Sequence, residues 1–226
     1  MRRIIIFMVI LFVFAGCAGT QENIPEITFE DFSENLMHYF ENKNDLIIYE
    51  TISIYENNNY SRMLDQADNI LLFFLYGIKI DDINRYNSFR DIVDKRKLQR
   101  LMNIFDTIEN NDIGIFLEQQ EPSPGLNDIY WTLFFSSGNV QYINHLITII
   151  NNYHNETENI NYYLAASSAM WSMALNIKTY SQVREYFIRN NIINNELKEY
   201  ILNTSPDRIQ SEAVEFIRRQ REMGTW

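Results

Sequence analysis

The chain has 226 residues, of which 46% are hydrophobic and 14% aromatic, and its formal net charge is −11. This apolar content excludes an intrinsically disordered chain, and the length suffices to bury a core without a disulfide or a metal ion. The acidic charge argues against a nucleic-acid partner, because phosphate groups repel a negative surface. Seven glycines and four prolines are too few for the frequent turns of a β-barrel or β-sandwich.

Residues 1–16 have the pattern of a cleavable export signal. Arg2 and Arg3 form a short basic segment, and an unbroken apolar run of eleven residues extends from Ile4 to Phe14. A helix of that length spans about 16 Å, roughly half the hydrocarbon thickness of a bilayer. The run therefore predicts a signal segment and not a transmembrane anchor.

The four residues Phe14-Ala15-Gly16-Cys17 resemble the lipobox of bacterial lipoproteins. In that family the cysteine thiol receives a diacylglycerol and a dedicated peptidase cuts just before it, which in this chain is between Gly16 and Cys17. Phe14 departs from the usual leucine of the lipobox. The alternative is an ordinary secretory signal in which Cys17 is incidental. Cys17 is the single cysteine of the sequence, which argues against disulfides, thiol catalysis and cysteine-based metal sites.

Residues 17–27 are predicted to form a lipidated tether that precedes a single domain over residues 28–226. Two or three acyl chains make anchoring stable, unlike one chain, so lipid on Cys17 predicts attachment to a membrane of the cell envelope. Ala18 follows the cysteine where, in enteric bacteria, an aspartate favours retention in the inner membrane. The resemblance therefore favours the outer membrane, with the domain facing the periplasm or the cell surface. Loss of the leader, which holds two arginines and no acid, changes the net charge to −13.

The mature chain has the periodicity of helices from its start. Thr28 and Asp31 predict a capping box at the first helix. Residues 46–55 are rich in isoleucine and tyrosine, so their pattern fits either a strand or a helix. The helical segments on both sides favour a helix. Residues 70–76 are apolar on every side, which predicts a central helix that is buried all round.

The middle of the chain contains its clearest break. Ser88 and Asp91 predict the start of a helix, and residues 98–108 repeat apolar side chains at helical spacing. Residues 121–125, with the sequence Glu-Pro-Ser-Pro-Gly, interrupt this pattern. They predict either a long loop between helices, which we favour, or a boundary between two subdomains.

Helical patterns continue to the end of the sequence. Gly138 predicts the end of one helix, and Ser205 followed by Pro206 predicts the start of the last. The remaining helices are expected at residues 127–137, 140–153, 156–176, 181–190 and 196–203. The sequence thus predicts an all-α fold of about nine or ten helices in antiparallel pairs, arranged as an irregular bundle or a short α-solenoid.

Two segments, residues 127–138 and residues 165–172, resemble a group of uncharacterised exported helical proteins of bacteria. The resemblance rests on the placement of tryptophan and glycine and covers about residues 120–190. It implies the same all-helical fold, and it implies no activity and no site.

No motif for metal, cofactor or nucleophilic chemistry is found. The three histidines lack the HExxH pattern and the i, i+4 spacing of a helical zinc site. His154 lies near Glu156 and Glu158, a set that suits weak metal binding, but a solvated loop is the simpler interpretation. No serine lies in a G-x-S-x-G turn. We therefore expect no cofactor, no metal and no catalytic residue.

Paired carboxylates are the one enzymatic alternative. An envelope glycan hydrolase needs two convergent acids, and Asp81 with Asp82 is the first pair to inspect. The simpler interpretation places both acids at the start of the next helix. A hydrolase of this kind should also show a cleft and a raised pKa.

Aromatic residues suggest a binding surface instead. Trp131 and Phe135 share one face of a predicted helix that is also apolar on another face, and Trp171 lies on a later helix. Such a helix is either deeply buried or offers one face to a partner. The favoured function is a membrane-anchored interaction or structural module of the cell envelope, with an envelope protein or peptide as partner. The alternative is the carboxylate hydrolase.

Overall fold

The computed structural model describes residues 28–56 and 61–226. The predicted leader, the lipobox-like segment with Cys17 and the predicted tether over residues 17–27 lie outside the described residues. The regular structure of the described part consists of twelve α-helices without a strand. This confirms the all-α prediction, with more helices than the nine or ten expected. A short helix over residues 113–118 had not been predicted, and the one helix expected after Ser88, with the apolar residues 98–108, is two helices. None of the helices in the described part is both long and apolar enough to cross a membrane.

The chain divides into two compact units, one ending at Asn111 and the other running from Asp112 to Trp226. Residues 121–125, where the sequence shows its clearest break, lie inside the second unit and lead into a helix. There Ser123 accepts a hydrogen bond from the backbone N–H of Leu126, and Pro124 takes the first helical position. Proline is favoured at that position because its missing N–H has no intrahelical partner in any case.

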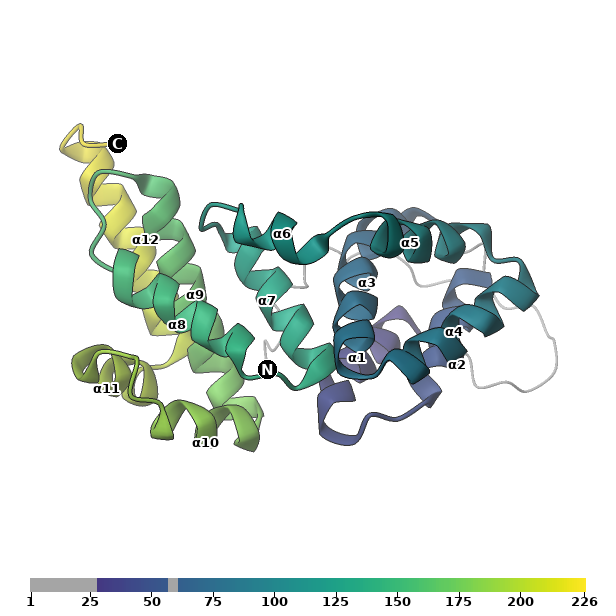
Figure 1. Ribbon diagram of the computed structural model, residues 1–226. Helices are drawn as coiled ribbons and strands as arrows, with labels where there is room; N and C mark the ends of the chain where they lie inside the picture. The colour runs from purple at the N-terminus through teal and green to yellow at the C-terminus, as the bar shows by residue number, and fades with distance from the viewer. Residues whose placement is uncertain (1–27, 57–60) are drawn as a thin grey trace. The chain divides into compact units, whose positions relative to one another are not determined.

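The first unit is built from five helices (Figure 1), which are α1 (Phe29–Asn42), α2 (Leu46–Glu56), α3 (Ser61–Asp81), α4 (Ile83–Arg96) and α5 (Gln99–Asn110). The capping box predicted for α1 is present, since Thr28 and Asp31 bond each other's backbone N–H. The segment 46–55, left open between strand and helix, lies within the helix α2.

Helix α3 contacts both α4 and α5 and supplies much of the core of the first unit. Leu71, Phe74 and Leu75 are buried in it. Leu72 and Tyr76, from the same turns, are only partly buried and pack against that core. The central helix predicted over residues 70–76 therefore exists, but one side of it is nearer to solvent than predicted.

The predicted helix start at Ser88 and Asp91 was wrong. Helix α4 begins at Ile83, where the Asp82 carboxylate accepts a hydrogen bond from the backbone N–H of Arg85 at 3.0 Å. Ser88 and Asp91 are exposed positions inside this helix. The earlier cap prevails because α3 ends at Asp81, so the first unsatisfied N–H groups after the bend are those beyond Asp82.

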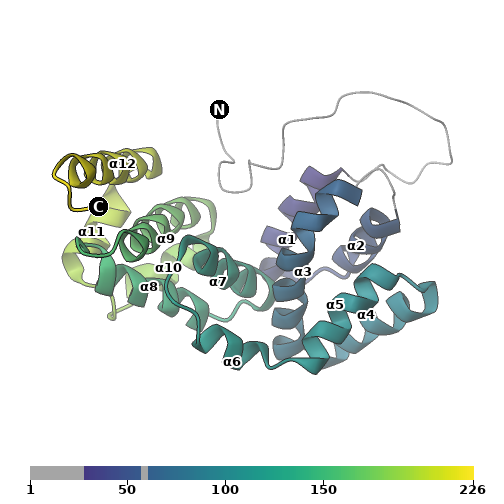
Figure 2. The ribbon, with the colours of Figure 1, turned by 90° about the horizontal axis from the view of Figure 1, so that it is seen from above.

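The second unit contains seven helices, which are α6 (Ile113–Glu118), α7 (Pro124–Ser137), α8 (Gln141–Tyr153), α9 (Ile160–Thr179), α10 (Ser181–Arg189), α11 (Asn195–Asn203) and α12 (Pro206–Glu222). Helix α9 is its centre and contacts α7, α8, α10, α11 and α12 (Figures 1 and 2). Ala165, Ala166 and Ala169 of α9 are fully buried. Their small side chains let neighbouring helices approach the axis of α9 closely.

The end of α7 and the start of α12 follow the local signals of the sequence, whereas α7 begins at Pro124, three residues earlier than expected. Gly138 ends α7 with a φ of 72°, in the left-handed region that glycine adopts without strain. Ser205 caps α12 through the N–H of Arg208, with Pro206 at the first position. Helix α9 begins four residues later than expected, because the carboxylate of Glu156 accepts backbone N–H groups in a turn that precedes the helix.

Candidate functional site

The three aromatic residues predicted to face a partner are buried. Trp131, Phe135 and Trp171 have exposed fractions of 5%, 7% and 9%. The Trp131 ring stacks on Phe135, with 5.7 Å between ring centroids, and its indole N–H donates to the Ser172 hydroxyl at 2.9 Å. These side chains pack inside the second unit, and in this structure they form no surface that a partner can reach.

The adjacent acids Asp81 and Asp82 do not converge on a common point. Asp82 caps α4, while Asp81 forms an ion pair with Lys43. Each carboxylate thus has a structural partner of its own. The arrangement that a glycan hydrolase requires, two acids on either side of one bond, is not formed by this pair.

One other carboxyl has an unusual environment. The Asp128 side chain on α7 still reaches solvent, yet the surrounding protein removes enough of its hydration to raise its pKa to about 6. Loss of hydration is the only cause, so no neighbouring charge contributes to this shift. A raised pKa is one feature of a general acid, but a raised pKa on one carboxyl does not by itself form a hydrolytic pair.

Replacement of Asp128 by asparagine is expected to change how stability depends on pH. Because the folded-state pKa is raised from 3.8 to about 6, the folded protein holds this proton more tightly than the unfolded chain does. The stabilising contribution of the protonated Asp128 side chain to the free energy of unfolding is therefore complete below about pH 4. It is lost as the pH rises through about 6. The melting temperature of Asp128→Asn, relative to the parent, should rise between pH 4 and pH 7. Thermal unfolding across that range measures it, and a difference independent of pH would contradict the assignment.

His154 does not gather acids around it. Its ring nitrogens contact the Ile150 carbonyl and the Asn155 amide, and Glu156 is occupied by backbone N–H groups. Within the described part of the chain, no group of three or more histidine, cysteine, aspartate or glutamate side chains is placed to hold a metal ion.

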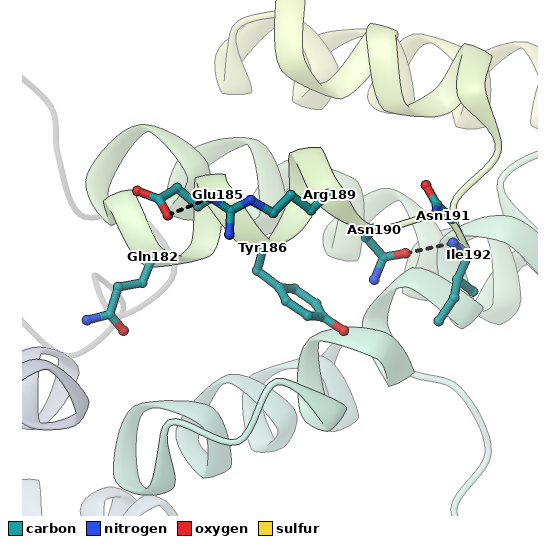
Figure 3. Close-up of a pocket in the computed structure, with 7 residues that line it drawn as sticks. All are labelled: Gln182, Glu185, Tyr186, Arg189, Asn190, Asn191 and Ile192. Carbon is teal, nitrogen blue, oxygen red and sulfur yellow. Dashed lines mark hydrogen bonds and ion pairs between the residues drawn. The ribbon is translucent and has the colours of Figure 1, made fainter.

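One hollow of the second unit lies along α10 and the loop that follows it (Figure 3). It has a volume of about 470 Å³ and is lined by Gln182, Glu185, Tyr186, Arg189, Asn190, Asn191 and Ile192. We call it the α10 pocket. Glu185 and Arg189 form an ion pair on its outer side and stay well exposed. Ile192 at its end is 55% exposed.

Asparagines of α8 hold the floor of the α10 pocket. The Asn144 side-chain oxygen accepts hydrogen bonds from the Tyr186 hydroxyl at 2.6 Å and from the Asn190 amide at 2.9 Å. Two turns later, Asn151 donates to the Ile192 carbonyl at 2.8 Å. These bonds fix the loop that carries the pocket to a rigid helix, so its polar groups need little reorganisation when they bind.

We expect Asn144→Ala to lower the free energy of unfolding by about 1–3 kcal/mol, because it leaves the partly buried donors of Tyr186 and Asn190 without this acceptor. Asn190 is only 7% exposed, so water cannot readily replace the lost partner. Gln141→Ala is the matched control, since the exposed Gln141 side chain accepts a hydrogen bond from the Asn144 amide at 3.3 Å and does not take part in the bonds to Tyr186 and Asn190. Denaturant unfolding compares the two, and equal losses would contradict the proposed role of Asn144.

The chemistry of the α10 pocket suits recognition. It offers amide groups, one carboxylate and one guanidinium, which together donate and accept hydrogen bonds, beside an aromatic ring and an apolar side chain. Its only acid is Glu185, and it contains no serine, cysteine, lysine or histidine. A second hollow, on α12, also holds a single acid, Glu222. Neither hollow therefore holds a pair of carboxylates.

The sequence interpretation did not identify the α10 pocket. Asparagine is abundant throughout the chain, so no single amide stands out. One signal was present, because Asn144 and Asn151 are seven residues apart in a predicted helix and must lie on the same side of it. Their partners lie about forty residues further along the chain, and no local pattern gives that distance.

Comparison with known protein families, with curated proteins and with solved structures finds no match for this chain.

Proposed function

We propose that the protein is a lipid-anchored interaction module of the bacterial cell envelope. The observation that carries this proposal is the single cysteine, Cys17, placed directly after a basic start, an apolar run of eleven residues and two small residues. A thiol in that context is the acceptor of lipid in the lipoproteins that the segment resembles. The acidic mature chain supports the proposal, because it would be repelled by anionic headgroups and so needs lipid to stay at a membrane.

The outer membrane is the favoured location, since Ala18 and not an aspartate follows the cysteine. The helical domain then faces the periplasm or the cell surface. In either place it meets other envelope proteins at high local concentration, because tethering confines both molecules to one surface.

We further propose that the α10 pocket binds the partner, an envelope protein or an extended peptide. The pocket is open, and its exposed side chains can pair with backbone N–H and C=O groups of a peptide. The exposed side chain of Ile192 adds an apolar contact at one end. Its lack of a nucleophile and of a second acid supports binding over hydrolysis.

Site-specific photo-cross-linking in intact cells tests the partner. A photoreactive amino acid at Gln182 or at Asn191 should give the same single adduct, whereas the exposed control position Thr157 should give none. The charge reversal Arg189→Glu, which places a second acid beside Glu185, should abolish the adduct. Equal adducts at the pocket and at the control position, or an adduct insensitive to Arg189→Glu, would refute the α10 pocket as the binding site.

A further inference from the structure

Helix α12 has an exposed side on which residues recur at helical spacing, as they do on its buried side. The buried side faces α9 and uses Ile209, Phe216 and Gln220. On the other side lie Asp207, Val214 and Arg221, and all three are exposed, Val214 to 61%. Because these three residues follow one another at intervals of seven, they form a nearly straight line along the helix.

Apolar atoms occupy the middle of this line. Val214, Ile217, Arg218, Arg221 and Glu222 line one continuous hollow on the surface of α12. We call Asp207, Val214, Ile217, Arg218 and Arg221 the outer stripe. Its spacing of three and four residues is that of the contact line between two paired helices.

The charges at the two ends of the outer stripe differ from the other charges of α12. Asp207 and Arg221 have no side-chain partner among the described residues. The remaining charged side chains of α12 are paired within the helix, in the sets Arg208–Glu212, Arg218–Glu215, Arg218–Glu222 and Arg219–Glu215. The two unpaired charges have opposite signs and lie at equal distances on either side of Val214.

We infer that the outer stripe pairs with the same stripe of a second copy of this chain, antiparallel, about a two-fold axis at Val214. In that arrangement Asp207 of each copy lies opposite Arg221 of the other, so two ion pairs form around a contact between the two valines. A parallel arrangement would instead place Asp207 against Asp207 and Arg221 against Arg221. A two-fold contact must be self-complementary, and this stripe has that property.

The contact would be modest in area, since it involves one helix face from each copy, and a small interface of this kind gives a weak or transient pair. Confinement at a surface would strengthen it by raising the effective concentration. The dimer contact requires neither the lipid anchor nor the α10 pocket. An experiment can therefore contradict any one of these three proposals without affecting the other two.

Cysteine cross-linking tests the antiparallel contact. In the full chain carrying Cys17→Ser, the added cysteine is the only thiol, so lipidation does not affect the result. Val214→Cys should give a disulfide-linked dimer on mild oxidation, because the axis brings its two Cβ atoms together. Arg219→Cys, exposed on another side of the same helix, should remain monomeric. Equal dimer yields for the two variants would overturn the inference.

Mixtures distinguish the two directions of pairing. Asp207→Cys and Arg221→Cys should each stay monomeric alone and should cross-link when mixed. If each variant cross-links with itself as readily as with the other, the antiparallel arrangement is wrong.

Charge reversal provides a second test without a new thiol. Asp207→Arg alone and Arg221→Asp alone should each weaken dimerisation several-fold in sedimentation experiments, while the double variant should restore it. Each single reversal also places an unfavourable charge at a helix end, and the double variant combines both. Restoration therefore cannot come from better helix stability. A double variant weaker than either single one would refute the pairing.

Discussion

Replacing Trp131 by alanine is expected to lower the free energy of unfolding of the second unit by about 3–5 kcal/mol, the usual cost of deleting a buried tryptophan side chain. The indole is 5% exposed. It stacks on Phe135, meets the edge of Phe134 at 6.0 Å between centroids, and donates a hydrogen bond to Ser172. Removing it leaves a cavity between α7 and α9 and takes away the donor to the Ser172 oxygen, although the Ser172 hydroxyl still donates to the Ala169 carbonyl. Denaturant unfolding followed by circular dichroism measures the loss.

Two matched variants separate packing from hydrogen bonding. Trp131→Phe keeps an aromatic ring in the same place and loses the indole N–H, so it should cost less than the alanine variant. Ser172→Ala keeps the indole and removes its acceptor, together with the hydroxyl's own bond to the Ala169 carbonyl. It should cost about 1–3 kcal/mol, because a buried N–H then has no partner. A loss below about 1 kcal/mol for Trp131→Ala would instead indicate an exposed side chain, as a partner-binding face requires.

The aromatic residues show where sequence periodicity stops being informative. Helix α7 is apolar on two sides, and that pattern fits both a deeply buried helix and one that presents a side to a partner. Which of the two applies depends on whether another helix of the same chain packs against the second apolar side of α7. In the structure α9 lies opposite, where Asn127 donates to the Ala165 carbonyl and Trp131 donates to the Ser172 hydroxyl, and Trp131 is buried. This is a long-range fact, because α7 and α9 are separated by a whole helix in the sequence.

Helix ends were easier to predict, because their causes are local. Thr28 with Asp31, Ser205 with Pro206, and Gly138 each act within four residues of the helix end that they define. The failure at Ser88 has the same origin. Ser88 and Asp91 have the chemistry of a cap, but Asp82 has it as well and lies earlier, directly after α3. Local rules identify the candidates, and the end of the preceding helix decides between them.

The α10 pocket lies beyond local rules altogether. Its floor depends on Asn144 and Asn151 meeting a loop about forty residues away. The same residue type is common in turns and caps elsewhere in this chain, for example at Asn159 and Asn194. Composition therefore suggested many equivalent asparagines, whereas the fold gives a few of them distinct partners.

Replacement of Cys17 by serine is expected to abolish incorporation of labelled palmitate into the protein. A hydroxyl does not take the place of the thiol that accepts diacylglycerol in the lipoproteins that this segment resembles, and Cys17 is the only cysteine available. In the parent chain, mass spectrometry should find the amino terminus at position 17 with its acyl groups. Membrane sedimentation is a poorer measure, because an uncleaved leader would still hold the variant at the membrane through its apolar run.

One further variant, Phe14→Leu, tests the lipobox assignment in the opposite direction. Phe14→Leu moves the segment closer to the usual lipobox and should keep or increase processing, whereas Cys17→Ser should block it. Neither change should alter the free energy of unfolding of the helical units, because the first described helix begins only at Phe29. A parent chain that retains its leader, or that carries an unmodified thiol at position 17, would show that the protein is not lipid-anchored.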